Sequence, residues 1–154
     1  MRVNDDKMDM LEAAIQDELI LIDFPLRHEF TTGFYLRTIF MPAGSILTSK
    51  IHKTRHPYVV KGKVNVQIDG GDVLKIVGTP EVPYCGITEV GTRRVLVVLA
   101  DTEWTTIHSL PYITGKENSL SEEEKLELVD KIEDEIIEKH ENKFLTKKEE
   151  LCLS

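Results

Sequence analysis

The side chains that could do chemistry gather in two segments of this chain. The first segment, residues 50–63, carries His52 and His56 among lysines and arginines, with no acidic residue between its ends. The second segment carries Arg94 and, further along, His108. Imidazole can bind transition metals or transfer protons near neutral pH, and guanidinium binds phosphate or carboxylate. These residue types therefore indicate three chemistries: metal binding, anion binding and acid–base catalysis.

Metal binding would use His52, His56 and His108 as a three-imidazole site, with water completing the coordination shell. Neutral imidazole suits Zn, Fe, Ni or Cu. No carboxylate stands among the three, although Glu103 is near in sequence. The competing interpretation is that these are hydrogen-bonding pocket or surface histidines. We expect no metal, and keep a divalent metal as the alternative.

Anion binding would use the cluster of basic residues, with Tyr58 or Trp104 stacking on a base or sugar. The cluster consists of Lys50, Lys53, Arg55, Lys61, Lys63, Arg93 and Arg94. Lysines at strand edges also prevent sheets from pairing, and this explains several of them equally well. Arg94 is different because it lies in an apolar run, and a guanidinium that faces inward needs a partner. The predicted ligand-binding residues are Arg94, His56, Tyr58, Trp104, Thr106 and Arg55.

Acid–base catalysis would divide the roles of acid and base between His52 and His108, the predicted catalytic pair. His52 also begins a His-x-Thr element, as in two-histidine phosphoesterases. The second copy of that element is missing, because the sequence before His108 runs in the reverse order.

The elements that must position these side chains are strands. From Gly33 the apolar residues alternate with period two, which predicts about eight short strands in a sandwich or barrel. The expected strands cover residues 34–41, 46–52, 56–62, 63–69, 73–78, 79–86, 93–99 and 103–110. The sequence Asp69–Asp72 predicts a hairpin turn, and Asp101–Thr102 a second turn. Residues two apart share a face, so we expect one inward group of His56, Tyr58, Trp104, Thr106 and His108, and another headed by Arg94.

Helices are expected at both ends of the chain. The spacing of apolar residues predicts a helix from Asp5 to about Glu18, followed by a short strand over 19–25. Ser121 and Glu124 form a capping box for a second helix that runs to about Asn142. We divide the chain into residues 1–32, a barrel of residues 33–111, and residues 112–154 with linker, acidic helix and tail. The apolar stripe of the second helix needs cover from the barrel flank or another subunit, and we expect a homodimer or higher oligomer.

Composition narrows the class of protein. The chain has 154 residues and a net charge of −8, typical of one soluble domain. Residues 33–110 hold nine basic and six acidic residues, so the β-region is basic and the flanks are acidic. We expect no extended nucleic acid and no membrane as partners. Cys85 and Cys152 do not form a disulfide framework, which favours a cytoplasmic location.

Several motifs together resemble the cupin superfamily. They are PAGS at residues 42–45, HPYVVKGKVNV at 56–66, GTRRV at 91–95 and DTEWTTIH at 101–108. The pattern resembles in particular small cupin-like proteins encoded by bacteriophages. The resemblance implies a mainly β, cupin-like antiparallel jelly-roll barrel with flanking N- and C-terminal helices, and a ligand or metal pocket inside. The usual cupin metal motifs are incomplete, since Arg55 and Arg94 occupy two of the expected ligand positions.

Three functions remain open from the sequence. The first is a barrel that binds a small anionic ligand, such as a nucleotide or sugar phosphate, and sequesters or degrades a host nucleotide signal if the phage resemblance holds. The second is a metal-dependent cupin enzyme, and the third a structural or interaction protein. On the first hypothesis, Arg94→Met abolishes anion binding while Arg93→Met, on the opposite face, has no effect.

Overall fold

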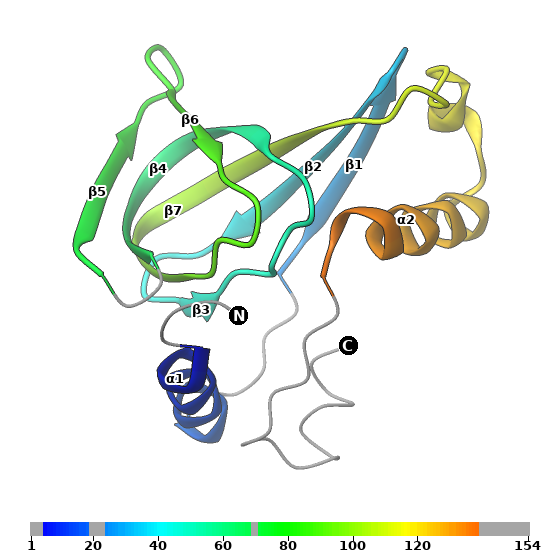
Figure 1. Ribbon diagram of the computed structural model, residues 1–154. Coiled ribbons are helices and arrows are strands. Elements are labelled where there is room, and N and C mark those ends of the chain that lie inside the picture. The colour runs from blue at the N-terminus through cyan, green and yellow to red at the C-terminus, as the bar shows by residue number, and fades with distance from the viewer. Residues whose placement is uncertain (1–4, 19–23, 69–70, 139–154) are drawn as a thin grey trace.

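The computed structural model describes residues 5–18, 24–68 and 71–138, and within them seven strands form a curved antiparallel sheet with helices outside (Figure 1). The helices are α1 (Asp5–Glu18), the 3-10 helix η1 (Lys116–Ser119) and α2 (Glu122–Ile136). The strands are β1 (Leu26–Thr31), β2 (Phe34–Met41), β3 (Ile46–Thr48), β4 (His56–Ile68), β5 (Val73–Gly78), β6 (Tyr84–Thr88) and β7 (Arg94–Ser109). This architecture confirms a mainly β fold, an antiparallel barrel with flanking helices.

Two long strands, β4 and β7, pair along most of their length and form the spine of the barrel. One half of β7 pairs with β2 and the other with β3, while β4 pairs with β6 in one half and β5 in the other. The spine bends at Gly62, where the register shifts. Gly62 has a φ of 144°, and an added Cβ would lie 2.2 Å from the Thr102 hydroxyl oxygen. Only glycine allows the two strands to approach so closely.

The structure differs from the sequence-based prediction at three strand boundaries. Gly62 does not end a strand, because β4 continues through it to Ile68. The expected turn at Asp101–Thr102 is a bulged stretch inside β7, and the predicted strands 93–99 and 103–110 are one. The strand expected over 46–52 ends at Thr48. Of the strand expected over 19–25, residues 19–23 lie outside the described part of the chain, as do the first two residues, 69 and 70, of the hairpin turn expected at 69–72.

Alternation along the spine determines which side chains line the interior. On β7 the buried positions include Arg94, Leu96, Val98, Trp104 and His108, so both halves of the strand face inward with even-numbered residues. The apolar end of the barrel is a core of Met41, Tyr58, Val60, Val64, Val66, Ile76, Leu96, Val98 and Trp104. The two inward groups expected from the sequence are therefore one continuous face of a single strand.

Helix α1 packs near β3 and is tied to the barrel by a buried ion pair (Figure 1). The guanidinium of Arg93 lies 2.5 Å from a carboxylate oxygen of Asp9, and both residues are almost completely buried. Glu12 adds a second carboxylate at 3.5 Å. Arg93 points away from the barrel interior, as expected. It is not exposed there, because α1 covers it.

Helix α2 begins at a capping box, as predicted. The Ser121 hydroxyl accepts a hydrogen bond from the Glu124 backbone N–H at 3.2 Å and donates one to the Glu124 carboxylate at 2.9 Å. The helix ends at Ile136, earlier than expected, and residues beyond 138 are not described. Its apolar side packs against the chain's own second core, which contains Phe30, Tyr35, Leu110, Ile113, Val129, Ile132 and Ile136. The barrel flank thus covers the apolar stripe of α2. The homodimer or higher oligomer stays a prediction, but an uncovered stripe no longer supports it.

Within the described ranges, no helix combines the length and apolar character needed to cross a membrane.

Candidate functional site

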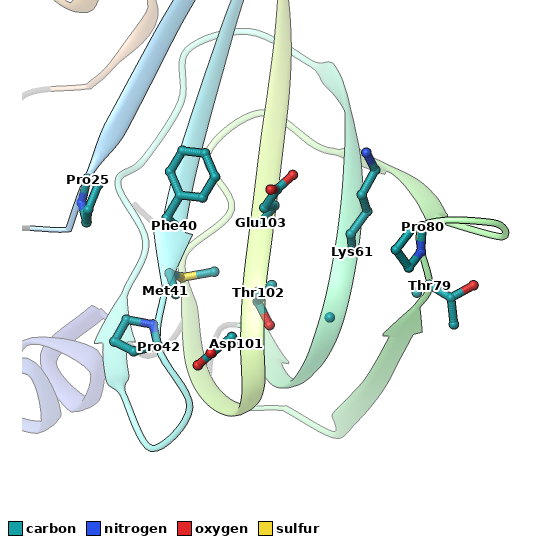
Figure 2. A pocket seen from close by; sticks show the side chains of 12 residues that line it. Pro25, Phe40, Met41, Pro42, Lys61, Thr79, Pro80, Asp101, Thr102 and Glu103 are labelled. Atoms are coloured by element: carbon teal, nitrogen blue, oxygen red, sulfur yellow. The ribbon is translucent and has the colours of Figure 1, made fainter.

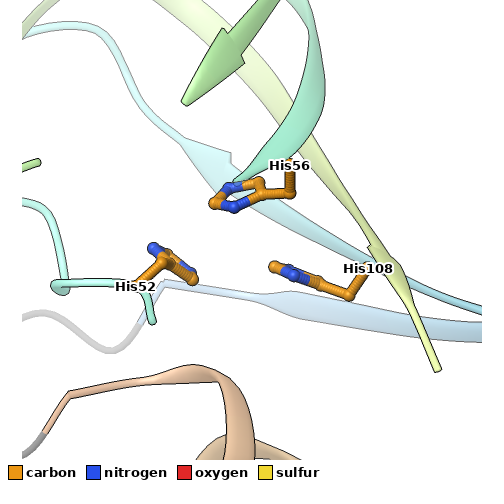
Figure 3. A group of neighbouring side chains, drawn as sticks. All are labelled: His52, His56 and His108. Carbon is orange, nitrogen blue, oxygen red and sulfur yellow. The ribbon is translucent and has the colours of Figure 1, made fainter. Parts of the chain in front are cut away.

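Three imidazoles converge at one end of the spine, where the start of β4 lies beside the end of β7 (Figure 3). His56 begins β4, His108 lies near the end of β7, and His52 comes from the loop between β3 and β4. One ring nitrogen from each of the three lies within 4.8 Å of the others, and the ring centroids of His56 and His108 are 4.6 Å apart. Among the described residues this trio is the group whose side chains could hold a metal ion.

His52 reaches the group although it is not on a strand, because the end of α2 holds its loop. The backbone of His52 forms an isolated antiparallel bridge with Ile137. On either side, Lys53 N–H donates to the Ile136 carbonyl and Glu138 N–H donates to the Ile51 carbonyl, each at 2.7 Å. These backbone contacts, and not a strand that continues into β4, bring His52 to His56.

Hydrogen bonds orient the imidazoles of His56 and His108. His56 Nδ1 lies 3.0 Å from the Thr54 carbonyl, to which it donates, so its Nε2 carries the lone pair. Backbone carbonyls that accept from one imidazole nitrogen are the usual supports of metal-binding histidines, because they fix the tautomer and the ring plane.

The tautomer of His108 is assigned from two contacts of the Thr106 hydroxyl. This oxygen lies 3.5 Å from the Arg37 carbonyl and 2.9 Å from His108 Nε2, and we assign it as donor to the carbonyl and acceptor from Nε2–H. His108 Nδ1 then carries the lone pair, and it is buried without a hydrogen-bond partner. A buried, unsatisfied nitrogen in a residue that is 1% exposed costs free energy unless something binds it.

All three imidazoles are held neutral. Burial, followed by the neighbouring His56, lowers the pKa of His52 and of His108 to about 3. Burial also lowers the pKa of His56. His56 and His108 are buried. His52 is half-buried, and its ring nitrogen lies in the same group of three. Neutral imidazole is the form that binds a metal, so the donors need not lose a proton first.

Arg94 enters the same pocket from the other end of the spine. Its guanidinium lies 5.1 Å from the ring centroid of Tyr58 and 5.7 Å from that of Trp104, and it donates to the Thr88 hydroxyl at 2.6 Å. Tyr58 and Trp104 stack on each other at 4.8 Å. These two rings, predicted to stack on a ligand, are therefore engaged with each other and with Arg94, all of them buried.

Most of the predicted site residues lie together, and one lies elsewhere. The structure assembles His52, His56, His108, Thr106, Tyr58, Trp104 and Arg94 at one end of the barrel. Arg55 is not among them: its side chain is 60% exposed and its guanidinium pairs with Glu89 at 3.0 Å on the surface. The structure places Arg55 on the surface because its neighbour His56 takes the inward position, and ligand binding by Arg55 stays a prediction.

Arg37 is a pocket residue that sequence analysis missed. It pairs in register with Thr106, so its side chain faces the same interior as Tyr35 and Ile39 on its strand. The strand sequence FYLRTIFM gives only a weak signal for Arg37, because both phases of its alternation are mostly apolar and do not tell the inner face from the outer one.

A separate groove of about 680 Å³ lies on the other face of β2, β4 and β7 (Figure 2). Phe40, Lys61 and Glu103, which are neighbours in register, line it together with Pro25 and Pro80. The groove includes none of the predicted site residues.

Comparisons with known proteins give no family for this chain. No family model matches the chain, and no curated protein matches it in sequence. Solved structures that match include ectoine synthase from P. lautus (17% identity, 68% of this chain and 75% of that one, TM-score 0.47). Another is an RmlC-like cupin family protein from Methanocaldococcus jannaschii (9% identity, 66% and 99% covered, TM-score 0.42). With TM-scores below 0.5, these similarities say nothing about what the chain binds.

Proposed function

We propose that this protein is a metal-dependent enzyme of the cupin type that acts on a small anionic molecule. His52, His56 and His108 hold one divalent transition metal, which leaves the usual cupin ligand positions, Arg55 and Arg94, unused. The observation that carries the proposal is the free Nδ1 of His108, which is buried, unpaired and part of a group of three neutral imidazoles. Geometry thus favours the alternative that the sequence placed second.

The donor set fits a borderline metal ion. Three neutral imidazole nitrogens are the protein ligands of catalytic zinc sites that keep a position open for water or substrate. When bound, such an ion supplies Lewis-acid chemistry and a water whose pKa is lowered toward neutrality. The remaining work falls to residues of this chain: Thr54, Thr106 and the clamp on the His52 loop keep the imidazoles in place.

The finer parts of the proposal concern the ligand. A basic barrel region favours an anion, and a nucleotide or sugar phosphate fits that chemistry. If the chain is encoded by a phage, removal of a host nucleotide signal would be a use for such an enzyme. Arg94 is already bonded to Thr88 and stacked on two rings, which supports a role in shaping the pocket beside any role in gripping the ligand.

The test measures metal affinity in metal-free protein by titration with Co²⁺, whose visible absorption reports coordination. We expect one equivalent to bind, and His108→Ala to weaken binding by at least about 100-fold because one of three ligands is lost. Thr106→Val should weaken it by about 10- to 100-fold, as the loss of an outer-shell partner does.

The matched control is His28→Gln, because His28 is a half-buried histidine that lies outside the trio and is bonded to the Tyr35 hydroxyl at 2.7 Å. It should leave Co²⁺ affinity unchanged. Binding that is absent in the natural protein, or that survives His108→Ala and His52→Ala undiminished in folded protein, would contradict the proposal.

A further inference from the structure

Arg37 places a charged side chain at the histidine end of the barrel. It is 17% exposed and faces the same interior as Thr106 and His108. Its Nε is buried and has no hydrogen-bond partner among the described residues. A charged donor left in this state costs free energy, and a fold tolerates it where a ligand completes the bond.

Among the residues that the structure describes, the carboxylate paired with this guanidinium is too distant for a hydrogen bond. An oxygen of Glu133, on α2, lies 3.8 Å from Arg37 Nε, which is an ion pair without a hydrogen bond. Glu133 is 29% exposed and so remains partly solvated. It can hold the guanidinium in place in the resting state and give way to a better acceptor.

Arg37 and Arg94 reach the pocket from different strands. Arg37 lies on β2 in register with Thr106, which is two residues from His108 on β7, whereas Arg94 lies on β7 itself and stacks on Tyr58 and Trp104. The three-histidine group contains no carboxylate among the described residues, so a divalent ion there would keep its full charge. A ligand that enters between the metal and Arg37 must therefore bring negative charge with it.

We propose that Arg37 binds the anionic oxygens of the substrate, a carboxylate or phosphate group, beside the three-histidine centre. The inference rests on the proposed function and names its substrate class. Guanidinium offers parallel N–H donors in a planar fork, which matches the two oxygens of either group. Glu133 competes with the substrate for the same guanidinium, so Arg37 is a binding residue whose resting partner is displaced.

The experiment measures binding of inorganic phosphate and of oxalate to the full chain by calorimetry, with and without Co²⁺. Arg37→Met should weaken binding of the preferred anion by about 10- to 100-fold, the effect of losing a charged hydrogen bond. Glu133→Gln should tighten binding by about two- to fivefold, because a competing surface-type ion pair is removed. A purely structural role of Arg37 would not predict opposite signs for the two variants.

Arg27→Met is the matched control, since Arg27 lies on β1, is 52% exposed and pairs with Glu29 at 2.6 Å. It should not change anion affinity. If Arg37→Met fails to fold, the direction in which Glu133→Gln changes anion affinity still tests the inference.

The outcomes separate the two proposals. If Co²⁺ does not bind but an anion binds the metal-free chain in a way that depends on Arg37, the metal proposal fails and this inference holds. If neither anion binds the natural chain, with or without Co²⁺, the inference is overturned. It is also overturned if Arg37→Met binds both anions as tightly as the natural chain, or if Glu133→Gln leaves anion affinity unchanged or weaker.

Discussion

Two regions of this molecule bury an arginine, and they balance its charge differently. Under α1, Arg93 meets Asp9 at 2.5 Å and Glu12 at 3.5 Å, so the chain itself supplies the opposite charge. At the histidine end of the barrel, the nearest carboxylate to Arg37 is Glu133 at 3.8 Å, and Arg37 Nε has no hydrogen bond. A buried charge that the chain neutralises holds structure together, whereas one left open is available for a ligand.

The contrast extends to the histidines. The Arg93 region joins oppositely charged groups, while the pocket gathers bases that repel one another when protonated. His52, His56 and His108 stay together because all three are neutral, a state that burial enforces. The first region gains stability from charge, and the second gives up stability to keep lone pairs free.

The largest expected effect is that of Arg93→Met. The substitution breaks a buried ion pair by removing one of its members, which should lower the free energy of unfolding by about 3–5 kcal/mol. Urea denaturation of the metal-free protein measures it. Arg27→Met, which breaks an exposed pair, should cost no more than about 1 kcal/mol. Equal effects of the two substitutions would remove the distinction between the regions.

The second prediction concerns pH and the histidine group of the metal-free protein. His52 and His108 have an ordinary pKa of 6.5 when unfolded and about 3 when folded. The unfolded chain then binds more protons, so the free energy of unfolding should fall progressively as pH drops from about 6.5 toward about 3. Denaturation across that window should show a shallower fall for His108→Gln. Parallel curves for the two proteins would mean that His108 is not held neutral by the fold.

The smallest expected effect is that of Thr88→Val, which removes the hydroxyl that accepts from Arg94 at 2.6 Å. The free energy of unfolding should fall by about 1.5–3 kcal/mol, because the bond involves a charged donor in a buried site. Thr38→Val is the control, since its hydroxyl bonds at 2.8 Å to the uncharged Thr105 and should cost about 1 kcal/mol. If Thr88→Val is neutral, other contacts of Arg94 carry its stability and the pocket is more adaptable than we infer.

Local pattern was enough to predict much of the framework. Alternation located β2 with both its ends correct, the hairpin strands around residue 70 and the inward face of His56 and Tyr58. The Ser121 capping box located the start of α2. These features depend on neighbours in sequence, where backbone geometry fixes which side chains share a face.

Long-range contacts decided the rest. Whether Gly62 ends a strand or bends one depends on how closely Thr102 approaches from another strand. His52 belongs to the site because the residues after α2 clamp its loop, and nothing near His52 in sequence indicates that partner.

The sequence by itself determined that this chain is an antiparallel barrel with basic and imidazole side chains on its inner faces. Tertiary structure alone decided which of those side chains meet and which charges are paired with an opposite charge of the chain. It paired Arg93 with α1, moved Arg55 to the surface and left the Nε of Arg37 unpaired beside three neutral histidines. The physical reason is that alternation fixes the direction of a side chain, while its partner across the barrel depends on where the whole spine bends.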